Sequence, residues 1–136
     1  MKKETLFEIA KEVMKNSYAP YSNYNVGAAL LTKNEDVYIG CNIENASYSV
    51  TCCAERTALF KAVSVGERDF SAICIVGGKN GVITDYAMPC GACRQALSEF
   101  CDADFKVYVG ISEDDIKEYT LGELLPHSFN KSKLGE

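Results

Sequence analysis

The order in which helical and strand patterns follow one another constrains the fold of this chain more than any other feature of its sequence. Apolar residues recur at helical spacing in some segments and form continuous runs, typical of buried strands, in others. The predicted elements, in chain order, are a helix at 3–16, strands at 26–31 and 37–41, a helix at 53–66, a strand at 72–76, a helix at 90–100, a strand at 105–109 and a short helix at 121–125. This alternation favours a mixed sheet with helices on both faces, in which the later strands run parallel through helical crossovers.

The composition favours a single domain and argues against several classes of partner. The chain has 136 residues, of which 47% are hydrophobic, and we expect one domain over 1–136. Its 14 basic and 19 acidic residues give a net charge of −5, which repels a phosphate backbone, so no nucleic-acid partner is expected. The sequence contains neither an apolar run of about 18 residues nor a signal peptide, so we expect no membrane span and a cytoplasmic location.

Seven cysteines raise the question of which of them carry chemistry. Their odd number, in a chain of this size without an export signal, argues against a disulfide framework. Cys41, Cys74 and Cys101 lie in apolar contexts, so we expect them to pack as small hydrophobic residues. Cys52 faces differently from its neighbour Cys53, and the single histidine, His127, has no partner at ligand spacing. Neither Cys52 nor His127 is expected to bind a metal.

Cys90 and Cys93 form a C-x-x-C pair at the predicted start of a helix. Residues three apart in a first helical turn lie on one face with Cβ atoms about 5–6 Å apart, so two thiolates can share a metal. Pro89 fits the helix entry, and the positive end of the helix dipole stabilises thiolates. A C-x-x-C motif alone is equally compatible with a redox pair, and at this point both interpretations stay open.

Cys53 and Glu55 favour a catalytic metal site. Cys53 is a third cysteine at the start of a separate predicted helix, and Glu55 follows two residues later. Residues two apart point about 200° away from each other on a regular helix, so both reach the metal only if Cys53 lies in the first turn. Three protein ligands leave a tetrahedral zinc ion with one open position for water, and Glu55 is then free to move protons without being a ligand.

Several motifs, in order along nearly the whole chain, resemble those of the small homotetrameric cytidine deaminases. The C-x-E and P-C-x-x-C signature of zinc-dependent nucleobase deaminases is present at 53–55 and 89–93. The other segments that carry the resemblance are 20–22, 26–30, 40–46, 56–58, 94–95 and 124–126. The resemblance implies a three-layer α/β/α sandwich with a mixed five-stranded sheet, and a homotetramer whose subunits share active sites.

The resemblance also implies a reaction and the residues that perform it. It implies one Zn²⁺ per chain on Cys53, Cys90 and Cys93, and hydrolytic deamination of cytidine and 2′-deoxycytidine to uridine and 2′-deoxyuridine plus ammonia in pyrimidine salvage, with Glu55 moving the protons. Many relatives have phenylalanine where this chain has Tyr24. The matching substrate-binding positions are Asn42 and Glu44 at the ribose, Tyr24 near the base, and Ala54, with Ala46, Tyr48 and Phe129 contributed by neighbouring subunits.

Arg56 has a predicted role that follows from charge. Three thiolates on a divalent ion leave a net negative charge, which a nearby guanidinium relieves. The resemblance likewise implies that this arginine donates hydrogen bonds to the cysteine ligands and so tunes the metal.

Three other functions compete with cytidine deamination. A relative that acts on another aminopyrimidine nucleoside, such as an antibiotic, would use identical zinc chemistry, although the segment 41–46 argues for ribose recognition. A non-catalytic structural zinc module would need a fourth protein ligand, for which Cys52 and His127 are the obvious donors. A polynucleotide-editing deaminase needs a basic or aromatic surface for the strand, which a net charge of −5 does not supply.

Overall fold

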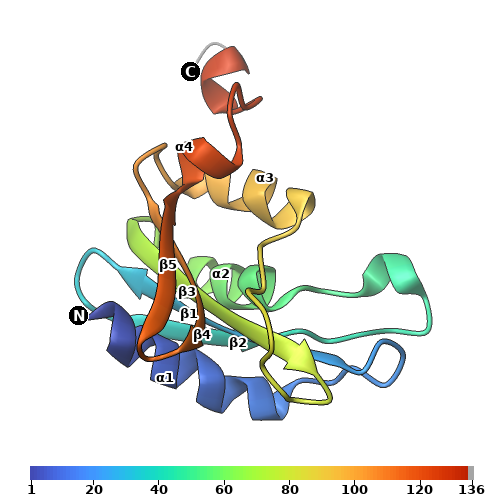
Figure 1. The fold of residues 1–136 in the computed structure, drawn as a ribbon. Helices are drawn as coiled ribbons and strands as arrows, with labels where there is room; N and C mark the ends of the chain where they lie inside the picture. Colours follow the sequence, from blue (N-terminus) through green and yellow to red (C-terminus); the bar gives the residue numbers. More distant parts are fainter. Residues whose placement is uncertain (135–136) are drawn as a thin grey trace.

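A mixed sheet of five strands organises the chain, which a computed structural model describes over residues 1–134. The last two residues of the predicted 1–136 domain lie outside the described part. The strands are β1 (Tyr24–Thr32), β2 (Val37–Cys41), β3 (Phe70–Lys79), β4 (Lys106–Ser112) and β5 (Asp115–Thr120), in the sheet order β2-β1-β3-β4-β5 (Figure 1). β1 pairs antiparallel with β2 and β3, β3 pairs parallel with β4, and β5 pairs antiparallel with β4. The predicted mixed sheet, with parallel strands joined by a helical crossover, is confirmed.

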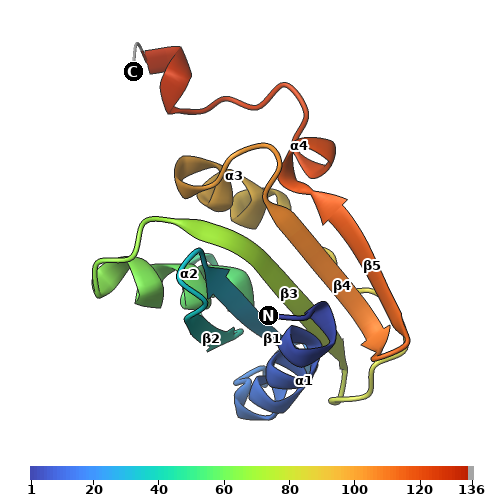
Figure 2. The ribbon, with the colours of Figure 1, turned by 90° about the vertical axis from the view of Figure 1, so that its left-hand side faces the viewer.

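Helices cover both faces of the sheet. α1 (Lys3–Val13) lies on one face, and α2 (Ala54–Ser64) and α3 (Gly91–Phe100) lie on the other, with α4 (Leu121–Leu124) following β5 (Figure 2). α3 is the crossover that joins the parallel strands β3 and β4. The arrangement is the three-layer α/β/α sandwich that the resemblance implies. Within residues 1–134, the helices lack the length and apolar character needed to cross a membrane.

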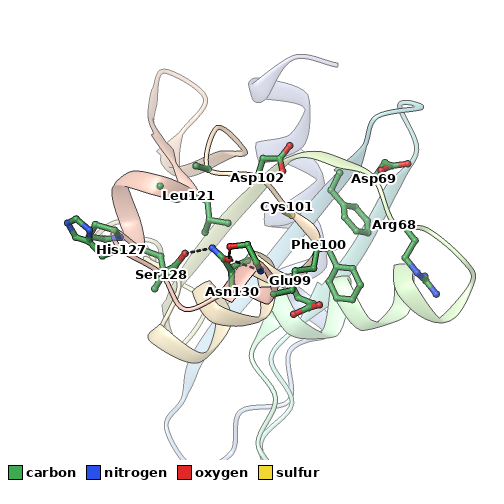
Figure 3. Close-up of a pocket in the computed structure, with 18 of the residues that line it drawn as sticks. Arg68, Asp69, Glu99, Phe100, Cys101, Asp102, Leu121, His127, Ser128 and Asn130 are labelled. Atoms are coloured by element: carbon green, nitrogen blue, oxygen red, sulfur yellow. Dashed lines mark hydrogen bonds between the residues drawn. The ribbon is translucent and has the colours of Figure 1, made fainter. Parts of the chain in front are cut away.

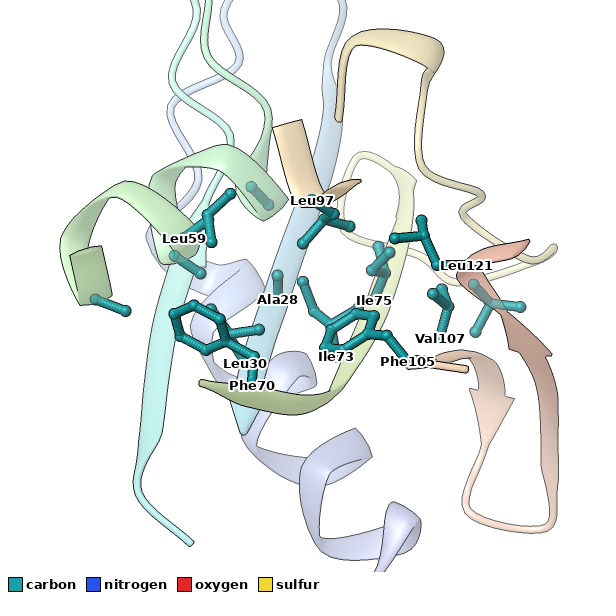
Figure 4. Packing of buried hydrophobic residues seen from close by; sticks show 14 of the residues in the cluster. Ala28, Leu30, Leu59, Phe70, Ile73, Ile75, Leu97, Phe105, Val107 and Leu121 are labelled. Carbon is teal, nitrogen blue, oxygen red and sulfur yellow. The ribbon is translucent and has the colours of Figure 1, made fainter. Parts of the chain in front are cut away.

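Alternate residues of the central strands point to opposite faces and fill two cores, as the period of two in a strand requires. The core beneath α2 and α3 includes Ala28, Leu30, Leu59, Ile73, Ile75 and Leu97 (Figure 4). The core against α1 includes Leu6, Phe7, Ala29, Leu31, Cys74 and Val76. The middle parts of the central strands β1 and β3 are continuous apolar runs because both of their faces are covered.

The apolar pattern of the sequence does not predict β5. Its six residues read DIKEYT, and Ile116 and Tyr119 are the only apolar side chains among them. β5 is an edge strand that pairs on one side with β4, so much of it faces water and carries charge. An edge strand lacks the continuous apolar run that predicts the buried strands.

The other predicted elements are present, with shifted ends. α1 stops at Val13, and a 3₁₀ turn at Met14–Asn16 completes the predicted helical segment 3–16. β1 and β3 each extend beyond their apolar runs because polar and glycine residues at their ends still pair in the ladder. Cys53 precedes α2 as its N-cap, so it lies where the spacing of Cys53 and Glu55 requires.

Gly40 in β2 allows α2 to approach the sheet closely. A Cβ atom at this position would lie 2.4 Å from the backbone nitrogen of Ala58 and 2.6 Å from the backbone oxygen of Ala54. Only glycine lacks this atom, so α2 rests directly on β2. The contact sets the position of the N-terminal end of α2, which carries part of the candidate site.

Candidate metal centre and active site

Two helix N-termini converge on one cluster of three thiols. Cys53 is the N-cap of α2, Cys90 is the N-cap of α3, and Cys93 lies in the first turn of α3. The three sulfur atoms all lie within 4.8 Å of one another. The Sγ atoms of Cys53 and Cys90 are 3.7 Å apart, and those of Cys90 and Cys93 are 3.5 Å apart. The N-terminal ends of the two helix dipoles place partial positive charge near these sulfurs, which favours the thiolate form.

The cluster fits a zinc ion. Tetrahedral zinc with Zn–S bonds of about 2.3 Å places its sulfur ligands roughly 3.8 Å apart, close to the separations between these cysteines. Within the part of the chain that the structure describes, the cluster contains no fourth histidine, cysteine or carboxylate. A three-thiolate donor set matches the ligand count of a catalytic zinc site, in which one position is left for water. The structure is therefore compatible with one zinc ion per chain.

Arg56 contacts the cluster from α2. Its Nη2 atom donates a hydrogen bond of 3.5 Å to the Sγ atom of Cys53. Hydrogen bonding from Cys93 and from Arg56 lowers the pKa of Cys53 to about 5. The hydrogen bond to Cys53 in turn raises the pKa of the Arg56 guanidinium above its ordinary value. Among the described residues, the Nε atom of Arg56 is the buried side-chain donor without a hydrogen-bond partner, so part of its hydrogen-bonding capacity is unused.

Glu55 places a buried carboxyl group beside the thiols. Glu55 belongs to the first turn of α2, and only 4% of its surface is exposed. Burial raises the pKa of Glu55 to about 7, and the negative charge of Cys53 acts in the same direction, whereas a hydrogen bond with Cys93 opposes them. Cys53 has an extended backbone with ψ of 156°, so it departs from helical geometry, and its side chain is near enough for its charge to act on the Glu55 carboxyl group.

Tyr24, the first residue of β1, is near the same carboxyl group. Burial raises the pKa of Tyr24, and the charges of Asp85 and Glu55 raise it further, so its hydroxyl group lies near both carboxylates. Asp85 was not among the predicted site residues. It belongs to the loop before Cys90, where no periodicity or motif distinguishes it from other polar loop residues.

Asn42 is held by hydrogen bonds within the chain. It is 8% exposed, and its Oδ1 atom accepts hydrogen bonds from the Ser17 hydroxyl at 2.5 Å and from the Val26 amide at 3.0 Å. Its Nδ2 atom donates to the backbone oxygen of Tyr24 at 2.8 Å. Asn42 therefore fixes the position of the Tyr24 backbone.

Glu44 borders a small cavity. Its carboxylate accepts hydrogen bonds from the Ser22 hydroxyl and from the backbone amides of Tyr21, at 2.9 Å, and Ser22, at 3.1 Å. The Ser22 hydroxyl in particular lowers the pKa of Glu44, which favours its charged form. The cavity has a volume of about 360 Å³ and is lined by Tyr21, Ser22, Glu44, Tyr48 and Thr51.

The residues predicted to serve neighbouring subunits are exposed. The segment 42–52 projects from the body of the chain and carries Ala46 and Tyr48 (Figure 1). Tyr48 is 74% exposed, and its ring lies 5.9 Å from that of Tyr21 in an edge-to-face arrangement. Phe129 is 64% exposed, although its backbone oxygen accepts a hydrogen bond from Gln95. Ala54, by contrast, is fully buried at the start of α2.

The remaining cysteines and the histidine stand apart from the cluster. Cys74 is buried in the core against α1, and Cys41 and Cys101 are half-buried. Cys52 accepts a hydrogen bond at 3.6 Å from a threonine hydroxyl of α2. His127 is exposed and lines a separate groove.

Glu99, Phe100 and Cys101, at the C-terminal end of α3, line that groove together with His127 and Ser128 (Figure 3). It has a volume of about 1110 Å³ and is lined by the C-terminal end of α3, the start of β3 and the residues after α4. None of the three clustered cysteines lines it. The chemistry of the donor groups, rather than the size of a hollow, therefore locates the candidate site.

The fold and the site define a class: an α/β protein in which two helix N-termini present a three-thiolate zinc site with a buried carboxyl group beside it. Comparison with known proteins narrows this class to one family. The sequence profile of the cytidine and deoxycytidylate deaminase zinc-binding region matches residues 1–110. The chain belongs to the cytidine and deoxycytidylate deaminase family, and the resemblance carried by its sequence motifs is confirmed.

The relatives agree over the whole length of the chain. A cytidine deaminase of Halalkalibacterium halodurans is 48% identical over 136 residues, which cover 100% of both chains. A cytidine deaminase of Sporosarcina psychrophila is 47% identical over 96% of this chain and 93% of the relative. The crystal structure of a cytidine deaminase from Burkholderia pseudomallei superposes with a TM-score of 0.87, is 44% identical, and covers 95% of this chain and 100% of its own.

A nucleoside-antibiotic deaminase is a more distant relative. The blasticidin-S deaminase of Bacillus cereus is 31% identical over 93% of this chain and 91% of its own. The difference in identity favours cytidine deaminases over the antibiotic alternative.

Proposed function

We propose that the protein catalyses zinc-dependent hydrolytic deamination of cytidine and 2′-deoxycytidine, giving uridine and 2′-deoxyuridine plus ammonia, as a step of pyrimidine salvage. One observation carries the proposal: the buried carboxyl group of Glu55 lies beside three thiols whose sulfur atoms are all within 4.8 Å of one another. Three protein ligands with a separate proton carrier are the composition of a catalytic zinc site. The relatives named cytidine deaminases support cytidine as the substrate.

Glu55 is the proton carrier. Cys53, Cys90 and Cys93 would hold the zinc ion, which as a Lewis acid would lower the pKa of water to about 7 and so supply a nucleophile at neutral pH. The Glu55 carboxylate accepts a proton from the attacking water and passes it to N3 of the cytosine ring. The second water proton passes through Glu55 to the amine, so the C4–N bond breaks, ammonia leaves, and the water oxygen becomes the uracil carbonyl. A pKa of about 7 suits a group that both accepts and donates protons near neutral pH.

The nucleoside is bound between the cysteine cluster and the loop that carries Glu44. The charged Glu44 carboxylate accepts a hydrogen bond from a ribose hydroxyl, and the cavity of about 360 Å³ beside it has room for part of the sugar. Asn42 also contacts the ribose, which requires exchange of one of its present hydrogen bonds. Tyr24 and Ala54 line the base, since Tyr24 lies near Glu55 and Ala54 immediately precedes it.

Arg56 stabilises the metal centre rather than the substrate. Its hydrogen bond to Cys53 disperses the negative charge that three thiolates leave on a divalent ion. The chain does not act on nucleic acid, because its net charge of −5 opposes binding of a phosphate backbone.

The working enzyme is a homotetramer with shared active sites. Ala46, Tyr48 and Phe129 reach the sites of neighbouring subunits, which explains why two large aromatic side chains, Tyr48 and Phe129, are exposed in the single chain. The protein works in the cytoplasm, where a reducing environment keeps the three ligand thiols available for zinc. Residues 1–136 act as one domain.

Ultraviolet absorbance of cytidine, 2′-deoxycytidine and cytosine, measured alongside zinc stoichiometry and ammonia release, tests the proposal. We expect deamination of both nucleosides and loss of the reaction in Glu55→Gln, with zinc retained. If the wild type deaminates none of the three compounds and Glu55→Gln leaves zinc binding and stability unchanged, the protein is a structural zinc module. Turnover of blasticidin S but of neither nucleoside would favour the antibiotic alternative, which rests on the 31% identity to a blasticidin-S deaminase.

A further inference from the structure

The C-terminal tail, defined as residues 125–134, is attached to α3 next to the metal-binding turn. Gln95 Nε2 donates a hydrogen bond of 2.7 Å to the backbone oxygen of Phe129. Arg94 Nη1 donates a hydrogen bond of 2.7 Å to the backbone oxygen of Leu124, the residue before the tail. Because Arg94 and Gln95 directly follow Cys93 in α3, a metal ligand and the donors of these two hydrogen bonds occupy three consecutive positions.

Arg94 also contacts the beginning of the metal-binding turn. Its Nε atom donates a hydrogen bond of 2.7 Å to the backbone oxygen of Pro89. The Pro89 side chain is fully buried, and the residue immediately precedes Cys90. The ion pairs found among residues 1–134 do not include Arg94. Its guanidinium group therefore spans two backbone carbonyls, a geometry that the fixed fork of arginine provides and the single ammonium group of lysine does not.

We infer that Arg94 and Gln95 are positioning residues that hold the tail, and with it Phe129, in a fixed register relative to Cys90 and Cys93. Every tail residue has a backbone carbonyl that could accept a hydrogen bond. The position of the donor on α3 therefore determines which tail residue is bound, and in this structure it is Phe129. The inference rests on the proposed function in one respect, which is that Phe129 contacts the cytosine base in the active site of a neighbouring subunit. The attachment of the tail to α3 is a property of the chain itself.

The two positioning residues hold different parts of the molecule. Gln95 contacts the tail, whereas Arg94 contacts both the residue before the tail and the turn that carries Cys90. Loss of the Gln95 donor therefore weakens nucleoside binding without disturbing the metal. Loss of the Arg94 fork releases the tail and also loosens the turn before Cys90.

The zinc-loaded, full-length protein with single substitutions tests the inference. Gln95→Glu keeps the shape of the side chain and replaces the donor by an acceptor that faces the Phe129 carbonyl. We expect amides of the tail to exchange with deuterium faster than in the wild type. We also expect the KM for cytidine to rise about tenfold, equivalent to about 1.4 kcal/mol, with kcat changed by less than about twofold and zinc content unchanged.

Arg94→Lys tests the two contacts of Arg94 together. The charge is kept and the fork is lost, so we expect faster exchange in the tail together with faster release of zinc to a chelator. Glu99→Gln is the matched control, because Glu99 is exposed on the same helix and no hydrogen bond of its side chain is found among the described residues. It is expected to match the wild type in tail exchange, KM and zinc release.

Unchanged tail exchange and KM in Gln95→Glu would overturn the inference. A fall in kcat or zinc content with KM unchanged would overturn it as well, because the residue would then support the fold and not the position of the tail. If the wild-type protein releases no ammonia from cytidine, the proposed function fails, and hydrogen exchange in Gln95→Glu still decides whether α3 holds the tail.

Discussion

The closeness of α2 to the sheet predicts that Gly40→Ala impairs zinc binding from a distance. The added Cβ would lie 2.4 Å from the backbone nitrogen of Ala58, so α2 must move outward by about 1 Å to restore ordinary van der Waals contact. Metal sites tolerate deviations of about 0.2 Å in ligand distance. Because Cys53 is the N-cap of α2 whereas Cys90 and Cys93 belong to α3, the movement pulls one ligand away from the other two.

We expect Gly40→Ala to lower the free energy of unfolding by about 1–3 kcal/mol, the usual cost of overpacking, which leaves a domain of ordinary stability folded. Zinc affinity should fall about 10–100-fold, as it does when groups that support metal ligands are disturbed. Competition with a chromophoric chelator measures the affinity, and urea denaturation of the metal-free protein measures the stability. Gly91→Ala is the folding control, since a Cβ there meets nothing within 4 Å. Wild-type zinc affinity in Gly40→Ala would refute the reasoning.

Three further predictions concern single side chains. Arg56→Ala removes the hydrogen bond to Cys53 and should speed zinc loss to a chelator, and unchanged zinc content and turnover would remove its assigned role. Burial raises the pKa of Cys74 from 9.0 to about 12, so the stability that this thiol contributes is complete below pH 9.0 and is lost as the pH rises toward 12. In wild-type protein, this thiol makes the free energy of unfolding fall by up to about 1.4 kcal/mol per pH unit in that window. Cys74→Ala should remove this part of the pH dependence, as measured by urea denaturation at several pH values. Tyr86→Phe removes the 2.5 Å hydrogen bond to Asp115 but keeps the ring beneath Lys117, so the free energy of unfolding should fall slightly, and an unchanged value in urea denaturation would show that the bond adds nothing.

The cysteine cluster could be predicted because its signals are local. Pro89 and the C-x-x-C spacing mark the start of α3, and the short distance in sequence between Cys53 and Glu55 requires a helix start there. Helix N-termini have recognisable sequences and favour thiolates, so both the ligands and their placement follow from a few adjacent residues. The structure agrees with the prediction that Cys53, Cys90 and Cys93 lie together, since their sulfur atoms, at the N-terminal ends of α2 and α3, are within 4.8 Å of one another.

The parts that sequence reasoning missed depend on contacts between distant segments. β5 is an edge strand whose charged residues face water, so it lacks an apolar run. Arg94 and Gln95 bind backbone carbonyls 30 and 34 residues away, and a carbonyl leaves no trace in the sequence. Asp85 comes near Tyr24 because a loop folds back, and loop residues carry no periodicity. The roles of Asn42, Glu44, Ala46, Tyr48 and Phe129 came from the family resemblance alone and stay predictions.

Ammonia release from cytidine by zinc-loaded wild-type protein and by Glu55→Gln tests the central claim most directly. The proposed mechanism predicts that each protein holds one zinc ion per chain, that the wild type releases one ammonia for each uridine formed, and that the variant is slower by about 10²–10⁴-fold. Equal rates in the two proteins, or a fully zinc-loaded wild type that releases no ammonia, would contradict it.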